Sequence, residues 1–275
     1  MLSVQKILVP VVLAETSRNV VHQAAWLARR LAGLLESGHE ITARDLHAHI
    51  VQRAQKDLDE TLLPEFDGIA VTRLLLRGNP AHEIVKTARD RNVDLIVMST
   101  RGEGAFYRLL LGSVTANVLH ETDCPVWTGA HLEDTPAREF SIRSVLCSVE
   151  LNGHSRHTVS LAAEMAAAVD ATLTLVHITG SVEIFGPGGS HVDPVWKERI
   201  VGSAAEEIAK LQQDVGTRAE VIIDSGNVPE LLNRAAERTK ADVLVIGHIP
   251  GRSHLGDNGN GYGIIRASRI PVLSL

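Results

Sequence analysis

Short apolar runs alternate with amphipathic segments along most of this chain, which is the pattern of strands alternating with helices. The run Val93–Met98 is typical of a strand buried on both faces of a parallel sheet. In the second half, a helix is predicted after Asn152-Gly-His-Ser155 and runs through Val169. Strands are predicted there at 142–149, 171–178, 219–224, 242–247 and 271–275. The alternation predicts an α/β fold, with helices on both faces of a parallel sheet.

The chain repeats itself with an offset of 148 residues over much of its length. Gly78-Asn79 opens a segment that leads to the strand Val93–Met98, and Gly226-Asn227 opens one that leads to Ala241–Ile246. The two halves also begin alike, at Lys6–Pro10 and Arg143–Cys147, and end alike, at Cys124–Trp127 and Ile270–Leu273. A polar, proline-containing stretch at 131–138 separates them, as linkers do. The sequence therefore predicts a tandem duplication with domains at 1–131 and 140–275.

The first half departs from this plan near its second strand. Residues 171–178 have a clear strand pattern, whereas the matching residues Gly33–Glu40 do not. The first helix is predicted to follow Glu15-Thr16-Ser17 and to end near Leu31, and Ile41–Leu62 is predicted as one long helix. Two alternatives stay open: the first half has lost its second strand, or a piece of chain is absent from the sequence.

Composition excludes several classes of partner. The net charge of −6 and the absence of a long basic run argue against a nucleic-acid surface, and 3% aromatic residues argue against base stacking. No apolar stretch approaches the length that spans a membrane, and the first residues lack the pattern of a signal peptide. The two cysteines, Cys124 and Cys147, lie in apolar strands and are expected to be buried and inert. A cytoplasmic protein without a membrane partner is expected.

The most informative stretch runs from Ser99 to Thr115, directly after the strand Val93–Met98. In open α/β sheets, ligands bind in the crevice beyond the carboxyl ends of the strands. Gly102 and Gly112 are nine residues apart, and glycines let the backbone approach a ligand closely. The hydroxyls of Ser113 and Thr115, with the free amides at the start of the next helix, can hold an anion. The stretch therefore predicts a phosphate-bearing ligand, a nucleotide.

These features resemble the universal stress protein family. The resemblance rests on two tandem α/β halves, the opening strand Lys6–Pro10, and the nucleotide motif Gly-x2-Gly-x9-Gly-Ser/Thr. Gly102, Gly112 and Ser113 match this motif, and Ser99 stands at its first glycine. The resemblance implies a doubly wound, five-stranded sheet of order 3-2-1-4-5 in each half and pairing of the halves through their last strands. It also implies binding of an adenine nucleotide, ATP.

By the same resemblance, the loop and turn contact the phosphates, and the end of the first strand borders the adenosine. The implied residues are Pro10, Val11, Val12, Ser99, Arg101, Gly102, Gly112, Ser113, Val114 and Thr115. Members that bind ATP usually carry an aspartate where this chain has Val12, and the second strand normally helps to cover the adenine. A polar group left without a partner costs about 1–3 kcal/mol. The sequence therefore predicts weak ATP binding in the first half, with Mg²⁺ held by the phosphates and Ser113.

The second half keeps a carboxylate but has an altered phosphate loop. Glu150 stands at the family's aspartate position, while Pro250, Tyr262 and Ile264 replace the glycine, serine and threonine of the first half. The candidate residues are Glu150, Gly247, Gly251, Arg252 and Gly261. One interpretation is a loop remodelled for another anion, with Arg252 and His254 as donors. The other, which the sequence favours, is a degenerate copy kept for pairing within the chain.

The sequence offers no nucleophile–base pair and no paired carboxylates, so turnover beyond slow ATP hydrolysis is not expected. No catalytic residue and no metal site are predicted: His154 and His157 are expected at exposed positions, and His177 is expected to be a satisfied core histidine. Two functions stay open. One is a regulatory stress-response protein that binds an adenine nucleotide in its first half, and the other is a partner-binding scaffold whose sites have both decayed. The sequence does not decide whether two chains associate into a homodimer.

Overall fold

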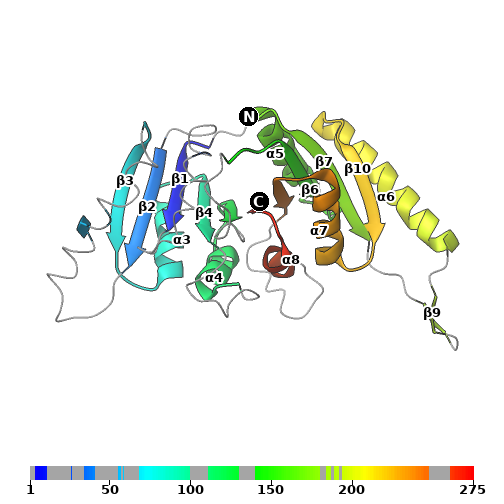
Figure 1. Cartoon of the computed structure of the whole chain (residues 1–275), viewed down its shortest axis with the longest axis horizontal. Helices are drawn as coiled ribbons and strands as arrows, with labels where there is room; N and C mark the ends of the chain where they lie inside the picture. The colour runs from blue at the N-terminus through cyan, green and yellow to red at the C-terminus, as the bar shows by residue number, and fades with distance from the viewer. Residues whose placement is uncertain are drawn as a thin grey trace.

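The computed structural model joins both halves of the chain in one ten-stranded sheet, shown in Figure 1. The residues that the structure describes are 4–10, 26, 34–40, 55, 56, 58, 68–99, 111–129, 140–179, 184–186, 189–191, 194–247 and 261–275. The strand order is β10-β7-β6-β11-β12-β5-β4-β1-β2-β3. Counted within each half, this is the order 3-2-1-4-5, so the predicted doubly wound α/β fold is confirmed.

The elements of the first repeat whose bounds the structure describes are five strands and two helices. They are β1 (Lys6–Pro10), β2 (Leu34–Glu40), β3 (Ala70–Leu76), α3 (Pro80–Asp90), β4 (Leu95–Ser99), α4 (Ser113–Glu121) and β5 (Val126–Gly129). The described part of the second repeat adds four helices and a small hairpin. Its elements are β6 (Ser144–Ser148), α5 (Ser155–Ala168), β7 (Thr172–Thr179), β8 (Ile184–Gly186), β9 (Gly189–His191), α6 (Pro194–Val215), β10 (Glu220–Ser225), α7 (Val228–Thr239), β11 (Val243–Ile246), α8 (Gly261–Ala267) and β12 (Val272–Ser274).

Each face of the sheet carries one hydrophobic cluster that runs through both repeats. On one face, α5 and α6 pack against inward side chains such as Ile7, Trp127 and Leu273. On the other face, α3, α4, α7 and α8 pack against residues that include Leu8 and Val272. Burying apolar surface on both faces stabilises a sheet whose strands are continuous apolar runs. The two repeats therefore share their cores instead of forming two separate ones.

The second strand of the first repeat is present, which corrects the expectation drawn from Gly33–Glu40. Strand β2 pairs in parallel with β3 over its whole length and with β1 from Leu34 to Gly38, beginning at Leu34 opposite Lys6 and Ala70. Hydrogen bonds from neighbours on both sides override the weak strand preference of a segment that contains Glu, Ser and Gly. Neither alternative proposed for a missing strand is therefore needed.

The predicted helices in this part of the first repeat lie mostly outside the described residues. Of the helix expected after Glu15-Thr16-Ser17, the structure describes Trp26, which is helical. Of the long helix expected over Ile41–Leu62, it describes Gln55, Lys56 and Leu58, which are also helical. In the second repeat, α5 begins at Ser155 and is capped at Val169, as predicted.

An aspartate ahead of each fourth strand ties that strand to the start of the first one. Oδ2 of Asp94 accepts hydrogen bonds from the backbone N–H groups of Lys6 and the residue before it, at 2.9 and 2.8 Å. Oδ2 of Asp242 accepts the same pair from Ser144 and the residue before it, at 3.0 and 2.7 Å. Hydrogen bonds to a carboxylate are stronger than neutral ones. The two halves thus repeat this contact as well as the residue types, with the aspartates 148 residues apart.

The two repeats meet where β5 and β12 pair antiparallel, with Leu273 opposite Trp127 and Ser274 opposite Val126. The hydroxyl of Thr128 donates to the backbone carbonyl of Val272 at 3.1 Å, and this bond is buried. Ser274 occupies the equivalent position of β12 and is 2% exposed. Among the described residues, its Oγ is the buried side-chain polar atom that has no hydrogen-bond partner. The backbone pairing is therefore two-fold, but the side-chain hydrogen bonding is not.

Phe140, the first described residue after the linker, packs its ring against two tryptophans of the first repeat. Its ring lies edge-to-face on Trp26, with centroids 5.2 Å apart, and on Trp127, with centroids 6.2 Å apart. Aromatic pairs of this geometry stabilise by about 0.5–1.5 kcal/mol beyond the area that they bury. The start of the second repeat is therefore anchored on the first.

Replacing Thr128 and Ser274 separately tests this asymmetry at the seam. We expect Thr128→Val to lower the free energy of unfolding by about 1 kcal/mol, because it removes the hydrogen bond to Val272 and leaves a buried carbonyl with one partner fewer. Ser274→Ala removes a hydroxyl that has no partner and is expected to leave stability unchanged or slightly raised. Urea unfolding of both variants measures the difference, and equal losses would contradict the asymmetry.

Candidate functional site

The site predicted in the first repeat lies where the winding of the sheet changes direction. Strands β1 and β4 are parallel neighbours, with Leu8 opposite Ile96, while the chain continues from β1 toward β2 and from β4 toward β5. Such a switch point opens a crevice beyond the carboxyl ends of the two strands. Pro10 and Ser99 are the last residues of β1 and β4, and both are half-buried. The structure therefore brings these two predicted site residues to the expected edge of the sheet.

Helix α4 begins at this edge with an uncapped N-terminus. Gly112 is the N-cap residue, with φ −60° and ψ 142°, and it supplies no side-chain cap. The first N–H groups of an α-helix have no partner within the helix, and the helix dipole makes this end positive. No acidic residue lies in the first turn of the helix. Ser113 is exposed at the same place, which makes the turn chemically suited to an anion.

Thr115 holds this turn against the sheet. Its side chain is 4% exposed, and its hydroxyl donates to the backbone carbonyl of Ser99 at 2.9 Å. The hydroxyl proton is thus committed to a contact between α4 and the end of β4. Thr115 therefore positions the turn, whereas Ser113 is exposed.

The remaining predicted residues of this site, Val11, Val12, Arg101 and Gly102, lie outside the described residues. Their contacts with a ligand stay predictions. The described members are Pro10, Ser99, Gly112, Ser113, Val114 and Thr115, and all of them lie at the ends of β1 and β4 or at the start of α4.

The second repeat has the same switch point between β6 and β11, with Leu146 opposite Leu244. Glu150 lies just beyond β6, is exposed, and accepts a hydrogen bond from the side chain of Asn152 at 2.8 Å. Gly247 follows β11, and a Cβ added there would lie 3.2 Å from Oγ1 of Thr158, so α5 approaches the backbone closely. Pro250, Gly251 and Arg252 lie outside the described residues.

The residues that replace the motif at the start of α8 make contacts of another kind. Gly261 begins the helix, and a Cβ added there would meet nothing within 4 Å. Tyr262, which stands where the first repeat has Ser113, donates its hydroxyl to the backbone carbonyl of Ala116 on α4 at 3.0 Å. Ile264, in the place of Thr115, is 4% exposed and belongs to the core. These contacts favour the interpretation that the altered copy serves pairing within the chain.

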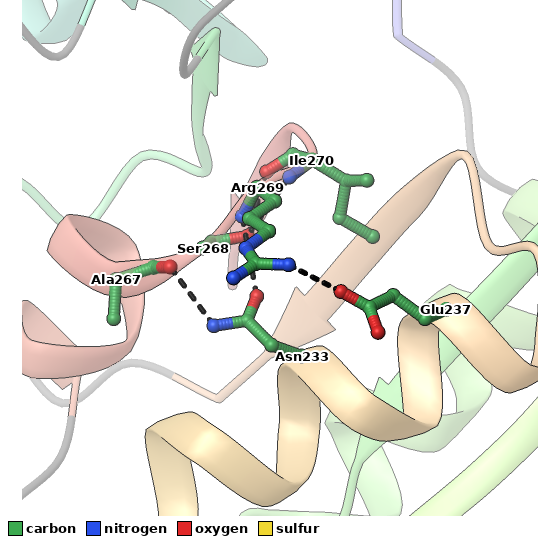
Figure 2. A network of polar contacts seen from close by, with 6 residues as sticks. All are labelled: Asn233, Glu237, Ala267, Ser268, Arg269 and Ile270. Carbon is green, nitrogen blue, oxygen red and sulfur yellow. Dashed lines mark hydrogen bonds and ion pairs between the residues drawn. The ribbon is translucent and has the colours of Figure 1, made fainter.

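The far end of α8 is fastened to α7 by a polar network, shown in Figure 2. The side-chain amide of Asn233 donates to the carbonyl of Ala267 at 2.9 Å and accepts from the backbone N–H of Arg269 at 3.2 Å. Arg269 also pairs with Glu237, although both side chains are largely exposed, so this ion pair contributes little. Neither Asn233 nor Ala116, the partner of Tyr262, can be recognised from the sequence alone, since neither lies in a recognisable motif.

Three histidines singled out from the sequence, His154, His157 and His177, lie among the described residues. His154 and His157 are exposed, as expected. Nδ1 of His177 lies 2.6 Å from the backbone carbonyl of Val149, and because a carbonyl only accepts, Nδ1 carries the proton and donates. Within the described part of the chain, no group of three or more His, Cys, Asp or Glu residues is arranged to hold a metal ion.

Both cysteines are held as thiols. Burial raises the pKa of Cys147 to about 12, and burial together with the nearby Asp94 raises the pKa of Cys124 to about 12. The Sγ of Cys124 donates to the carbonyl of Val93 at 3.2 Å. The expected burial in a strand is confirmed for Cys147, which lies in β6, whereas Cys124 is half-buried and lies ahead of β5.

Comparison with known proteins identifies the family to which this chain belongs. Residues 3–128 and 141–274 each match the model of the universal stress protein family. The chain therefore belongs to this family, as a member with two tandem copies of the family domain.

Individual relatives agree with this assignment. A universal stress protein of Methanocaldococcus jannaschii is 35% identical over 98 residues, which cover 35% of this chain and 59% of that protein. One of Mycobacterium tuberculosis is 26% identical over 213 residues, which cover 74% of this chain and 68% of that protein. The aligned part spans only 35 to 59% of the length of the first five relatives.

Solved structures show the same architecture over the whole chain. A universal stress protein from Archaeoglobus fulgidus superposes with a TM-score of 0.71 at 22% identity, covering 100% of this chain and 97% of that one. At this level of identity the likeness shows the fold. No helix in the described part of this chain is both long and apolar enough to cross a bilayer.

We expect neither cysteine to react with iodoacetamide in the native protein at pH 8. The thiolate is the attacking form, and a pKa of about 12 leaves roughly one thiol in ten thousand ionised at this pH. Mass spectrometry after a timed reaction should show no label on the folded protein and two labels after unfolding in urea. Rapid native labelling of Cys124 would contradict its placement against Val93.

Proposed function

We propose that this universal stress protein binds one adenine nucleotide, ATP, per chain in its first repeat and acts as a regulatory stress-response module. The observation that carries the proposal is the start of α4. Its uncapped N-terminus lies beside the carboxyl ends of β1 and β4, at the switch point of the sheet. Backbone N–H groups and a positive helix end are suited to phosphate.

The chemistry of the turn agrees with a phosphate ligand. Ser113 is exposed and brings a hydroxyl to the turn, while Thr115 fixes the turn to Ser99. When Mg²⁺ accompanies the phosphates, Ser113 is the residue that would share in holding it. Nothing in the described part of the site pairs a nucleophile with a base, so the proposed role is binding and regulation.

Solved universal stress proteins include one described in complex with cAMP and one from Archaeoglobus fulgidus described in complex with dAMP. They match 49% and 44% of this chain with TM-scores of 0.35 and 0.37. Those ligands belong to those proteins. For this chain, support comes from the turn at Gly112 and from the motif in which that glycine stands.

The presence of β2 raises the affinity expected from the sequence. Two defects were expected to weaken binding, the missing carboxylate at Val12 and the missing second strand. Since β2 lies beside β1 along its whole length, only the first remains. One unpaired polar group costs about 1–3 kcal/mol, which is roughly a fivefold to 150-fold loss of affinity. We therefore infer that the first repeat binds ATP more weakly than a site that keeps the carboxylate, by a factor in this range.

In this proposal, the second repeat pairs with the first and does not bind a nucleotide. Tyr262 takes the place of a phosphate-binding serine and contacts the partner repeat, and Ile264 is part of the core. A phosphate at the start of α8 would meet a half-buried tyrosine in place of a hydroxyl at the turn. A stoichiometry of one nucleotide per chain follows.

Substitution of Gly112 tests the site. Its φ and ψ lie in a region open to all L-residues, so Gly112→Val is expected to fold. The branched side chain would occupy the approach of the phosphate, so ATP binding is expected to fall at least a hundredfold. Isothermal titration calorimetry with ATP, with and without Mg²⁺, measures both affinity and stoichiometry.

Gly202→Val provides the matched control, because this glycine is exposed in the middle of α6 and a Cβ there meets nothing within 4 Å. It should leave ATP binding unchanged. Unaltered affinity in Gly112→Val would remove the site from this turn. Absence of any heat with ATP up to millimolar concentration in the unmodified protein would favour the scaffold function instead.

A further inference from the structure

The first turns of α4 are held from two sides, and one of the two holders comes from the other repeat. On one side, Thr115 donates to the end of β4 at Ser99. On the other side, Tyr262 reaches across from α8 and donates to the carbonyl of Ala116, 146 residues away in the chain. Ala116 lies one residue beyond Thr115 and donates its own N–H to the carbonyl of Gly112 at 2.9 Å. The cross-repeat bond therefore acts on the helical turn that carries Gly112.

The tyrosine is well suited to a fixed hydrogen bond. Its side chain is half-buried and packs against the hydrophobic cluster of the α4 and α8 face. Burial raises the pKa of Tyr262, so the hydroxyl stays protonated and able to donate at all ordinary pH values. A phenol has two side-chain torsions, so little conformational entropy is lost in holding it.

Helix α8 is itself anchored to α7, so the hydrogen bond from Tyr262 joins α4 to a fixed helix. The side chain of Asn233 on α7 binds both the carbonyl of Ala267 and the N–H of Arg269, at the opposite end of α8 (Figure 2). The turn that follows is closed by Ser268, whose hydroxyl donates to the carbonyl of Ile270 at 2.7 Å. Helix α8 thus spans the distance from α7 to α4 with polar contacts at both ends.

We propose that Tyr262 is a positioning residue for the phosphate-binding turn of the first repeat. The altered motif of the second repeat holds α4, through Ala116, at the spacing from β4 at which the amides of Ser113 to Thr115 meet a phosphate. The second repeat then acts on the first site without binding a nucleotide itself. The inference rests on the proposed function for its ligand, and on the described contacts for its geometry.

The test is Tyr262→Phe, which removes one hydroxyl and keeps the ring in the core. In the ligand-free protein, the amides of α4 are expected to exchange with solvent about fivefold faster, as the loss of one hydrogen bond allows. In titration calorimetry, affinity for ATP is expected to fall several-fold, while affinity for adenosine, which has no phosphate, stays unchanged. A general loss of stability would weaken both ligands alike.

Thr172→Val is the matched control. It also removes one hydroxyl that donates to a backbone carbonyl in the second repeat, that of Arg143 at 3.2 Å, but it is remote from α4. Thr172→Val should change neither the exchange rate of the α4 amides nor the ratio of the affinity for ATP to that for adenosine.

The outcomes separate this inference from the proposed function. If the unmodified protein binds ATP and Tyr262→Phe binds it equally well, the positioning role is overturned and the proposed function stands. If the amide hydrogen exchange of α4 is unchanged in Tyr262→Phe, the hydrogen bond does not hold the helix. The inference then fails whatever the affinity for ATP. If the unmodified protein binds no ATP, the proposed function fails, and the positioning of a phosphate turn fails with it.

Discussion

The antiparallel pairing of β5 with β12 is the interaction on which the rest of the architecture depends. Through it, ten strands form one sheet, and the hydrophobic cluster on each face passes from one repeat into the other. Each repeat alone would end in an exposed apolar strand with Trp127 or Leu273 at its edge, and such edges are prone to unwanted pairing. The pairing also brings α8 against α4, without which Tyr262 would have no partner.

Most of the fold follows from patterns that are local in the sequence. The five strands that the second repeat adds to the ten-stranded sheet lie within two residues of the predicted positions, because buried parallel strands are continuous apolar runs bounded by turns. Strand β2 is the exception. Its segment Leu34–Glu40 has little strand preference of its own, and it is a strand because β1 and β3 supply hydrogen bonds on both sides. Contacts of that kind have no local signature.

In the candidate site, too, the features with a local sequence pattern could be predicted and the long-range contacts could not. The spacing of Gly102 and Gly112 located the start of α4, and the structure places that start beside the ends of β1 and β4. The pairing of Thr115 with Ser99 and of Tyr262 with Ala116 joins residues 16 and 146 positions apart. The available signal for the second was the tyrosine itself, an aromatic residue where a phosphate-binding turn requires a small hydroxyl. Its partner could be identified only once the fold had brought α8 to α4.

The hydrogen bond from Tyr262 to Ala116 runs from the second repeat to the first and has no counterpart in the other direction, because the first repeat has Ser113 at the tyrosine's position. Two identical chains that paired through their last strands would have to carry every substitution twice, so a tyrosine on one would appear on both and neither would keep its serine. Covalent fusion removes this constraint, because each half can take a different residue at the same place. The halves of this protein are therefore not interchangeable parts. A dimer of first halves would have two turns and no tyrosine at the position of Tyr262, and a dimer of second halves would have that tyrosine twice and no turn.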